Sequence, residues 1–261
     1  MIEAVDLRFG YPGHTVGQGL SLALRAGEVV ALLGPNGGGK TTLLKTLLGL
    51  LPAQGGEVRL DGCSLTGWAL PERARRVGYV PQGQASTFGY SARQIVLMGR
   101  TAHLGLLARP GARDQAVADQ ALRRLGIDHL ADRSVHRMSG GERQLVLIAR
   151  ALAQEPRAVL LDEPTASLDF GNQGLVMRAI RALAGEGLGV LFTTHDPNQA
   201  RRCADTALLL REGCVLAAGP VAQVVNAVNL RALYGADVDD SDGPGGLPVF
   251  LPVFQGGVGG Q

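Results

Sequence analysis

Residues 34–41 read Gly-Pro-Asn-Gly-Gly-Gly-Lys-Thr and decide the fold of this chain. They match the pattern G-x-x-x-x-G-K-[ST], in which glycines, a lysine and a hydroxyl stand at fixed spacing. The run at 29–33 is continuously apolar and predicts a fully buried strand, and residues 40–50 have the composition of a helix. Strand, glycine loop and helix therefore follow one another in the order that a phosphate-binding loop requires.

The chemistry of such a loop explains its residue types. Glycines let successive backbone N–H groups turn toward one centre, and the N-terminus of the next helix adds positive potential. Lys40 would reach the β and γ phosphates of a nucleotide, and the Thr41 hydroxyl would bind Mg²⁺. Glycine is abundant here, at 38 of 261 residues, so the glycines alone carry little weight. The lysine carries more, because only Lys40 and Lys45 are lysines.

The composition excludes one large class of protein. The 25 basic and 23 acidic residues give a net charge of +2, too even for a protein whose work is to neutralise nucleic-acid phosphate. Aromatic residues make up 4% of the chain, too few for base-stacking surfaces. We therefore expect no nucleic-acid partner.

The cysteines and the first residues bear on location. Cys63, Cys203 and Cys214 form no C-x-x-C pair, which argues against a disulfide framework or a zinc site and suits a reducing cytoplasm. Residues 1–6 carry acids where a secretory signal carries positive charge, and no apolar run approaches the roughly 20 residues of a membrane span. Any membrane role is expected to be peripheral.

Hydrophobic patterns predict the remaining elements. Alternation at 2–9 and 20–24 indicates a short antiparallel edge sheet, and residues 91–132 read as a helical insertion. Helices and buried strands then alternate, in the order helix 141–154, strand 158–161, helix 172–184, strand 189–193 and helix 196–203. This order predicts an α/β fold with a mostly parallel sheet core and helices on both faces.

The domain organisation follows from the same patterns. We expect a single domain over residues 1–240 that contains a helical subdomain at about 84–136. From 241 to 261 glycine and proline dominate, which predicts a loosely ordered C-terminal tail.

Polar residues follow two of the predicted buried strands. Asp162 and Glu163 come directly after the apolar run at 159–161, at the end of the strand where open α/β sheets bind ligands. Asp162 would hold the Mg²⁺ shell, and Glu163 would orient or deprotonate the attacking water. His195 follows the apolar run at 190–192 and could touch a γ phosphate, although a histidine in such a loop is more often structural.

A second anion site is predicted at residues 139–144, which read Ser-Gly-Gly-Glu-Arg-Gln and open a helix with a hydroxyl and two glycines. The alternative is an ordinary helix cap with accidental glycines. One nucleotide needs only one phosphate cradle. Two cradles in one chain therefore favour an arrangement in which the loop of one copy and the helix start of another hold each ATP.

Together these motifs resemble the ATP-binding subunit of an ABC transporter, over about residues 2–235. The resemblance implies a P-loop NTPase fold of the ABC ATPase type, ATP hydrolysis coupled to transport, and ATP and Mg²⁺ as cofactors. The matching segments are the Walker A loop at 34–41, the Q-loop at 79–82, the signature at 139–144, Walker B at 160–163, the D-loop at 167–169 and the switch histidine at 195.

The resemblance also implies a role for each residue at the site. The implied catalytic residues are Lys40, Gln82, Glu163 and His195. The implied ATP-binding residues are Tyr11, whose ring would stack on adenine, and Gly34, Pro35, Asn36, Gly37, Gly38, Gly39, Lys40, Thr41 and Thr42. The implied metal ligands are Thr41, Gln82 and Asp162. The signature residues that would act on the ATP of the partner copy are Ser139, Gly140, Gly141 and Glu142.

Three positions depart from the usual family pattern. Gly38 stands where serine, alanine or cysteine is commoner, Met138 replaces a leucine, and Leu145 replaces a polar residue. None of these changes removes a reacting group. Gly38 has more backbone freedom to lose than a larger residue, so it could loosen the loop.

Rival functions stay open at this point. A soluble ABC ATPase, such as an assembly or repair factor, is disfavoured because the chain has one cassette, no long heptad pattern and no basic excess. A nucleotide-gated scaffold that does not hydrolyse ATP would be marked by the loss of Glu163 or His195, and both are present. A GTPase is disfavoured because no N-K-x-D segment occurs.

The resemblance further implies the partners and the location. The partners are a second copy of the chain in a head-to-tail dimer, an integral membrane permease docked on the helical subdomain, and a substrate-binding protein. The chain would then be peripheral to the cytoplasmic face of the cell membrane through the permease.

The cargo is predicted from segments outside the ATP site. Residues 94–100 and 229–235 resemble stretches of importers for iron-siderophore complexes, haem and cobalamin. Residues 168–173 point the same way, although some molybdate importers share them. The alternative is that these segments only pack helices. If the first segment faces the permease, charge reversal near Arg100 should uncouple uptake from ATP hydrolysis.

Overall fold

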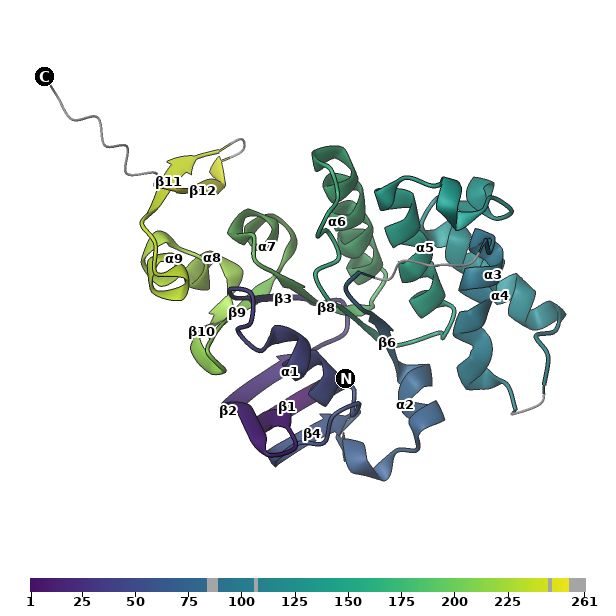
Figure 1. Ribbon diagram of the computed structural model, residues 1–261, viewed down its shortest axis with the longest axis horizontal. Coiled ribbons are helices and arrows are strands. Elements are labelled where there is room, and N and C mark those ends of the chain that lie inside the picture. Colours follow the sequence, from purple (N-terminus) through teal and green to yellow (C-terminus); the bar gives the residue numbers. More distant parts are fainter. Residues whose placement is uncertain (84–88, 106–107, 244–245, 254–261) are drawn as a thin grey trace, which may run out of the picture.

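The chain is described by a computed structural model that covers residues 1–83, 89–105, 108–243 and 246–253. A six-stranded sheet forms its centre (Figure 1). The strands along this sheet are β10 (Cys214–Pro220), β9 (Thr206–Arg211), β3 (Val29–Leu33), β8 (Gly189–Thr194), β7 (Ala158–Leu161) and β6 (Val77–Val80). Every neighbouring pair is parallel except β10 with β9. The predicted α/β fold with a mostly parallel core is confirmed.

An antiparallel sheet packs beside the central one, as predicted. Its strands, in spatial order, are β2 (His14–Leu24), β1 (Ile2–Tyr11), β4 (Gly55–Leu60) and β5 (Cys63–Ser64). Ile2 lies opposite Leu24 on one side and Leu60 on the other, so β1 is paired along both edges. In Figure 1 the helix α1 (Lys40–Leu47) lies between the two sheets.

The strand before the glycine loop is buried on both faces. All five side chains of β3 are buried, which its continuous apolar run predicted. Val29, Ala31 and Leu33 belong to the core that includes helices α5 and α6, whereas Val30 and Leu32 belong to the core under α1 and β1. Because successive side chains of a strand point to opposite faces of the sheet, β3 contributes to the hydrophobic layers on both sides of the central sheet.

The helices cover both faces of the central sheet. Their bounds are α2 (Leu70–Arg76), α3 (Ala92–Leu97), α4 (Ala112–Arg124), α5 (Gly140–Leu152), α6 (Phe170–Gly185), α7 (Pro197–Cys203), α8 (Val221–Val224) and α9 (Ala227–Tyr234). Short 3₁₀ turns are η1 (Leu65–Gly67), η2 (Met98–His103), η3 (Asp128–Leu130) and η4 (Val135–Arg137). None of the helices in the described ranges is long and apolar enough to cross a membrane.

Helices α3 and α4 form a separate lobe on α5, at the right of Figure 1. They occupy most of the range in which a helical subdomain is expected; residues 84–88 of that range lie outside the described part. Ala118, Ala121 and Leu122 of α4 are buried in this lobe, so its amphipathic pattern faces α3 and α5.

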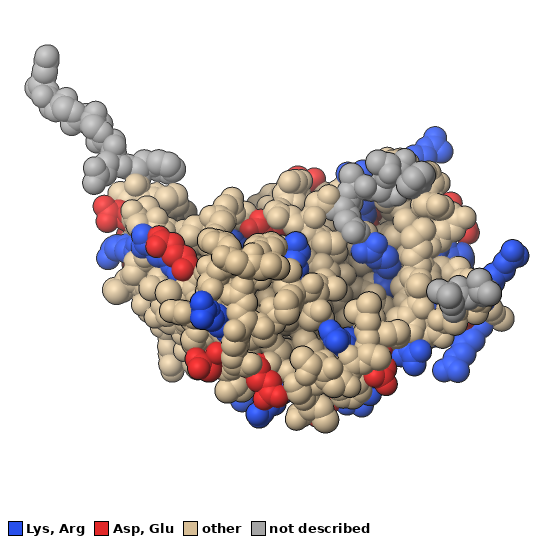
Figure 2. All heavy atoms as spheres, turned by 60° about the horizontal axis from the view of Figure 1, so that its bottom comes forward, with Lys and Arg blue, Asp and Glu red and all other residues tan. Residues whose placement is uncertain are grey.

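Charges of both signs are scattered over the face shown in Figure 2. Among the described residues, several charges of opposite sign pair between elements, such as Arg124 with Glu186 at 2.7 Å and Arg181 with Asp205 at 2.8 Å. Salt screens the interaction between exposed charges that lie more than a Debye length apart. Interspersed charges of opposite sign therefore produce little electrostatic field at longer range.

The segment around 241–252 differs from the predicted loosely ordered tail. Strand β11 (Val238–Asp242) pairs antiparallel with β12 (Pro248–Pro252), at the upper left of Figure 1. Phe250 is buried, and its backbone N–H and C=O bond the side chain of Asn198 at 2.9 and 3.0 Å. The prolines were misleading because both lie at the ends of β12, where no ladder donor is needed. Residues 244–245 and 254–261 of the predicted tail lie outside the described residues.

Arg100 does not face a partner, which contradicts the expectation that charge reversal there would disturb permease contact. Its side chain is only 3% exposed and pairs with Asp114 at 2.9 Å and Glu155 at 2.7 Å. Its guanidinium also donates to the carbonyl of Ala153 at 2.7 Å. Arg100 therefore ties η2 to α4 and to the end of α5, and its charge is used inside the lobe.

We predict that Arg100→Ala lowers the free energy of unfolding by about 3 kcal/mol, because it leaves partly buried carboxylates without their cation. Arg93→Ala is the matched control, since Arg93 also pairs with two carboxylates in this lobe, Asp119 and Asp132, but its side chain is 35% exposed. It should cost less than about 1 kcal/mol. Urea unfolding of both variants checks this, and equal losses would contradict it.

Candidate active site

The glycine loop leads from β3 into α1 and leaves little room for side chains. A Cβ at Gly34 would lie 2.2 Å from the carbonyl oxygen of Leu210, so only glycine fits there. Gly37 and Gly39 have φ of 78° and 96°, in the left-handed region, and Gly39 caps the start of α1. The loop thus turns its backbone around one centre at the helix N-terminus, as a phosphate cradle requires.

Lys40 lies over this loop. Its Nζ donates to the carbonyl oxygens of Gly34 at 2.8 Å and Pro35 at 3.0 Å, and lies 3.3 Å from Glu163 Oε1. Its side chain is 5% exposed. A buried ammonium is costly unless it is paired, and here one carboxylate and two carbonyls satisfy it. An anionic ligand in the cradle would meet the same ammonium.

Asp162 follows β7 and is held from two sides. Thr41 Oγ1 donates to its Oδ2 at 2.7 Å, and Thr193 Oγ1 donates to its Oδ1 at 2.8 Å. The carboxylate and the Thr41 hydroxyl are adjacent oxygen donors, the type of ligand that Mg²⁺ prefers. The pair therefore fits a magnesium ion that is also bound to phosphate oxygens.

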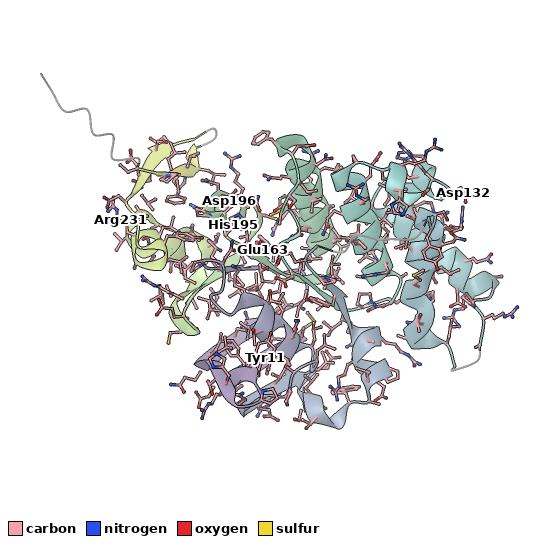
Figure 3. The ribbon with its side chains drawn as sticks, viewed as in Figure 1. Tyr11, Asp132, Glu163, His195, Asp196 and Arg231 are labelled. Atoms are coloured by element: carbon pink, nitrogen blue, oxygen red, sulfur yellow. The ribbon has the colours of Figure 1, made fainter. Side chains whose placement is uncertain are left out.

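Glu163 is the centre of a polar cluster. Its Oε2 accepts a hydrogen bond from Gln82 Nε2 at 3.0 Å and lies 3.5 Å from His195 Nδ1. Its φ is 44°, an uncommon value for a residue with a Cβ, and its backbone N–H donates to Thr193 Oγ1 at 2.7 Å. Figure 3 shows Glu163 and His195 side by side above the central sheet. A carboxylate placed between a cation, an amide and an imidazole can orient and deprotonate a water.

A cavity of about 290 Å³ adjoins this cluster. It is lined by Glu163, Ser167, Thr194, His195, Gln199 and neighbouring residues. The D-loop residue Ser167 has a φ of 64°, so two strained backbone positions frame the cavity.

The parallel strands explain why these side chains meet. The phosphate loop, Asp162 and His195 follow the ends of β3, β7 and β8, and Gln82 follows the end of β6. Carboxyl ends of parallel strands share one edge of a sheet. The structure thus brings together Lys40, Gln82, Asp162, Glu163 and His195, which the sequence analysis selected.

Tyr11 lies apart from this cluster. It ends β1 opposite His14, is 43% exposed, and stands on the antiparallel sheet in Figure 3, away from Glu163. An exposed ring on the rim of that sheet offers a face for stacking. Its role toward adenine remains a prediction.

The signature segment begins α5 with a capping box. Ser139 Oγ accepts from the Glu142 N–H at 3.1 Å, and Glu142 Oε2 accepts from the Ser139 N–H at 2.7 Å. A Cβ at Gly141 would lie 2.2 Å from Asn172 Oδ1 of α6. The hydroxyl therefore serves as a helix cap, and the glycine allows close helix packing. Both observations are compatible with an additional role toward a partner's nucleotide.

Sequence reasoning missed Thr193 at this site. Its hydroxyl joins Asp162 to the backbone of Glu163, and the residue is fully buried. In the sequence, the only sign of its role is that Thr193 is polar and directly follows the apolar run at 190–192, two positions before His195.

Known proteins resemble this chain closely. The family model described as ABC transporter matches residues 18–166. The hemin import ATP-binding protein of Myxococcus xanthus is 42% identical, covering 92% of both chains. The ferric enterobactin transport ATP-binding protein of Escherichia coli is 37% identical over 97% of this chain and 94% of its own. The molybdate import ATP-binding protein of Haemophilus influenzae is 41% identical over 83% and 81%.

One solved structure extends the comparison to three dimensions. A chain of a metal-chelate type ABC transporter in an inward-facing conformation superposes with a TM-score of 0.85 at 36% identity. The match covers 97% of this chain and 98% of that one.

We predict that Thr193→Val lowers the free energy of unfolding by about 2 kcal/mol, because it leaves the partly buried Glu163 N–H and one oxygen of the buried Asp162 without a partner. Thr193→Ser keeps the hydroxyl and should cost about 1 kcal/mol, the value of a buried methyl group. Urea unfolding measures both. Equal stability of the valine variant and the wild type would show that the hydroxyl is not needed.

Proposed function

Because this chain belongs to the ABC transporter family, we propose that it hydrolyses ATP to drive an importer for a metal chelate, such as haem or a ferric siderophore. One observation carries the enzymatic part: Glu163 lies within hydrogen-bond or ion-pair distance of Lys40, Gln82 and His195, at the edge of the sheet where the phosphate loop begins. The same edge holds Asp162 and Thr41 at 2.7 Å.

The geometry supports a division of roles in hydrolysis. Lys40 holds the β and γ phosphates, and the loop N–H groups neutralise their charge. Glu163 accepts a proton from the attacking water, which Gln82 helps to orient. His195, whose side chain is 56% exposed, bonds the γ phosphate from the open side. Mg²⁺ held by Thr41 and Asp162, with Gln82 nearby, would neutralise phosphate charge when bound.

A second copy of the chain completes the site. The start of α5 presents Ser139 and two glycines at a helix N-terminus, the type of site that binds phosphate. In a head-to-tail dimer this helix start would close over the nucleotide in the phosphate loop of the other copy. Ser139, Gly140, Gly141 and Glu142 then act on the partner's ATP.

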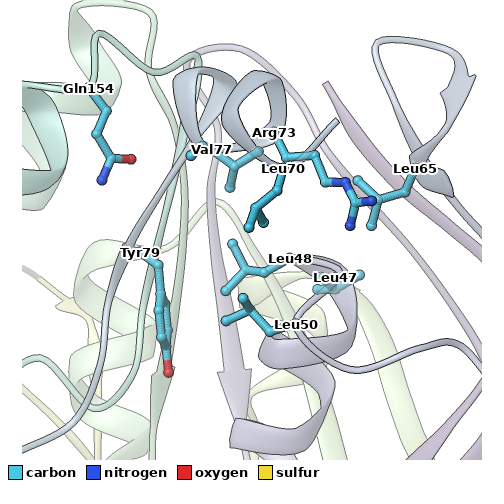
Figure 4. Close-up of a pocket in the computed structure, with 10 residues that line it drawn as sticks. Leu47, Leu48, Leu50, Leu65, Leu70, Arg73, Val77, Tyr79 and Gln154 are labelled. Atoms are coloured by element: carbon cyan, nitrogen blue, oxygen red, sulfur yellow. The ribbon is translucent and has the colours of Figure 1, made fainter. Parts of the chain in front are cut away.

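A groove next to β6 fits the docking of the membrane permease (Figure 4), although its lining residues lie outside the helical subdomain at 84–136 on which the family resemblance placed the permease. It has a volume of about 250 Å³, and its apolar lining includes Leu47, Leu50, Leu65, Leu70, Val77 and Tyr79. Leu50 and Leu70 are 53% and 61% exposed. Apolar side chains that are exposed together indicate a surface that binds a partner. We assign a short apolar helix of the permease to this groove. Displacement of this helix would move β6 and therefore Gln82, which lies two residues after the end of β6.

The docked permease would also set the location. In this arrangement the chain is attached through the groove, peripherally, at the cytoplasmic face of the cell membrane. A substrate-binding protein on the other face would deliver the cargo.

The cargo class is supported mainly by the relatives. Two segments that resembled chelate importers also pack helices: Ile95 and Val96 are buried in α3, and Leu230 and Leu233 in α9. Packing explains these positions without reference to cargo. The hemin relative of Myxococcus xanthus and the ferric enterobactin relative of Escherichia coli match over 92% and 97% of this chain, and the molybdate relative matches over 83%. Molybdate import is therefore the alternative.

We predict that Glu163→Gln retains ATP binding but slows turnover at least about 100-fold, because the amide cannot accept the proton of the water. The dimer should then accumulate with ATP. Glu186→Gln is the control, since Glu186 pairs with Arg124 on the surface, far from the phosphate loop in sequence. Phosphate release and size-exclusion chromatography measure both effects. Normal turnover in Glu163→Gln would remove Glu163 from the reaction.

Deletion of the gene should abolish ATP-dependent uptake of one chelate, haem or a ferric siderophore, in cells without a redundant ATPase. Uptake of labelled haem, ferric chelate, cobalamin and molybdate is measured side by side. Restoration by the wild type but not by Glu163→Gln ties uptake to hydrolysis. Loss of molybdate uptake alone would support the alternative cargo, and unchanged uptake of all four would favour a soluble ATPase.

A further inference from the structure

Tyr234 connects the last helix to the loop that carries His195. It ends α9, and the following Gly235, with a φ of 64°, turns the chain away. The Tyr234 hydroxyl donates to the backbone carbonyl of His195 at 2.8 Å. Neither its sequence position, 39 residues from His195, nor any motif used above predicts this contact.

The bond completes a clamp on one peptide group. The His195 carbonyl belongs to the peptide that joins His195 to Asp196, and the N–H of the same peptide donates to Thr194 Oγ1 at 3.0 Å. Bonds from both sides fix the plane of that peptide and therefore ψ of His195. The backbone that carries the imidazole is thus held where Nδ1 lies 3.5 Å from Glu163 Oε2.

The helix that carries Tyr234 is itself well anchored. Leu230 and Leu233 are buried, and the side chain of Asn226 caps the helix by accepting from the Asn229 N–H at 2.9 Å. Arg231 donates to the carbonyl of Val238 at 2.8 Å and so joins α9 to β11. The tyrosine hydroxyl is therefore presented from a rigid support.

The loop would have room to move without this bond. A cavity of about 410 Å³ lies between the loop, α9 and the hairpin β11–β12, and Figure 3 shows His195 and Asp196 next to one another on that side. Its lining includes His195, Asn198, Leu230, Tyr234 and Phe250. Across the cavity, Asn198 bonds the backbone of Phe250.

The hydroxyl keeps its proton at neutral pH. Burial raises the pKa of Tyr234, and the carboxylates of Asp196 and Glu163 raise it further. A neutral phenol donates a hydrogen bond, which a phenolate cannot do.

We propose that Tyr234 is a positioning residue that holds the backbone of His195 in the orientation required for ATP hydrolysis. The inference deepens the proposed function and depends on it. Because its hydroxyl bonds the backbone of His195 and not the phosphate loop, Tyr234 should affect the chemical step and leave nucleotide binding unchanged.

The test uses the full chain and compares Tyr234→Phe with wild type. Loss of one hydrogen bond should lower kcat for ATP about fivefold, while KM for ATP stays within about twofold. Asn226→Ala is the comparison for α9: it removes the helix cap and should lower the melting temperature, but it should reduce kcat less than Tyr234→Phe does, because the buried Leu230 and Leu233 still hold the helix. In a His195→Ala background, Tyr234→Phe should cause no further loss in the residual rate, because the two residues act as a unit.

Three results would overturn the inference. One is an unchanged kcat in Tyr234→Phe, and another is an equal loss of kcat in Asn226→Ala, which would assign the effect to helix packing. The third is a full additional loss in the His195→Ala background. Absence of ATP hydrolysis by the wild-type chain would instead remove the proposed function, so the two failures are distinguishable.

Discussion

Parallel pairing of β3, β8, β7 and β6 is the constraint on which the rest of the molecule depends. Parallel neighbours end at the same edge, so residues that are more than a hundred positions apart in the chain, such as Lys40 and Glu163, meet there. Because each of these strands is covered on both faces, its residues are largely apolar. The polar residues of the site lie at the last positions of a strand, as Thr193 does in β8, or after its end, and that restriction concentrates the chemistry in one place.

The cluster at this edge is electrostatically balanced. Lys40 and Asp162 are nearly fully buried, and each is satisfied by specific partners: carbonyls and Glu163 for the lysine, two threonine hydroxyls for the aspartate. Buried charges are tolerable only under that condition. Phosphate oxygens would take the place of Glu163 beside Lys40. Glu163 would then be available to a water.

The sequence predicted the residues that react better than those that hold them. Lys40, Asp162 and Glu163 were recognisable because a motif or the end of an apolar run marks each position. Thr193 and Tyr234 act through contacts between segments 30 and 39 residues apart, which periodicity cannot reveal. The hairpin after α9 was missed because composition outweighed the short apolar centre of β12. Arg100 was read as a surface charge, since sequence alone does not show that Asp114 and Glu155 reach it.

In the proposed mechanism, each ATP is hydrolysed between the phosphate loop of one copy and the α5 start of another. Mixing two inactive variants, Lys40→Ala and Ser139→Arg, tests this arrangement, because a mixed head-to-tail dimer contains one intact site. ATP hydrolysis should reappear on mixing, at about a quarter of the wild-type rate if dimers exchange freely and sites act independently. A rate that stays at the level of the separate variants, although mixed dimers form, would contradict it.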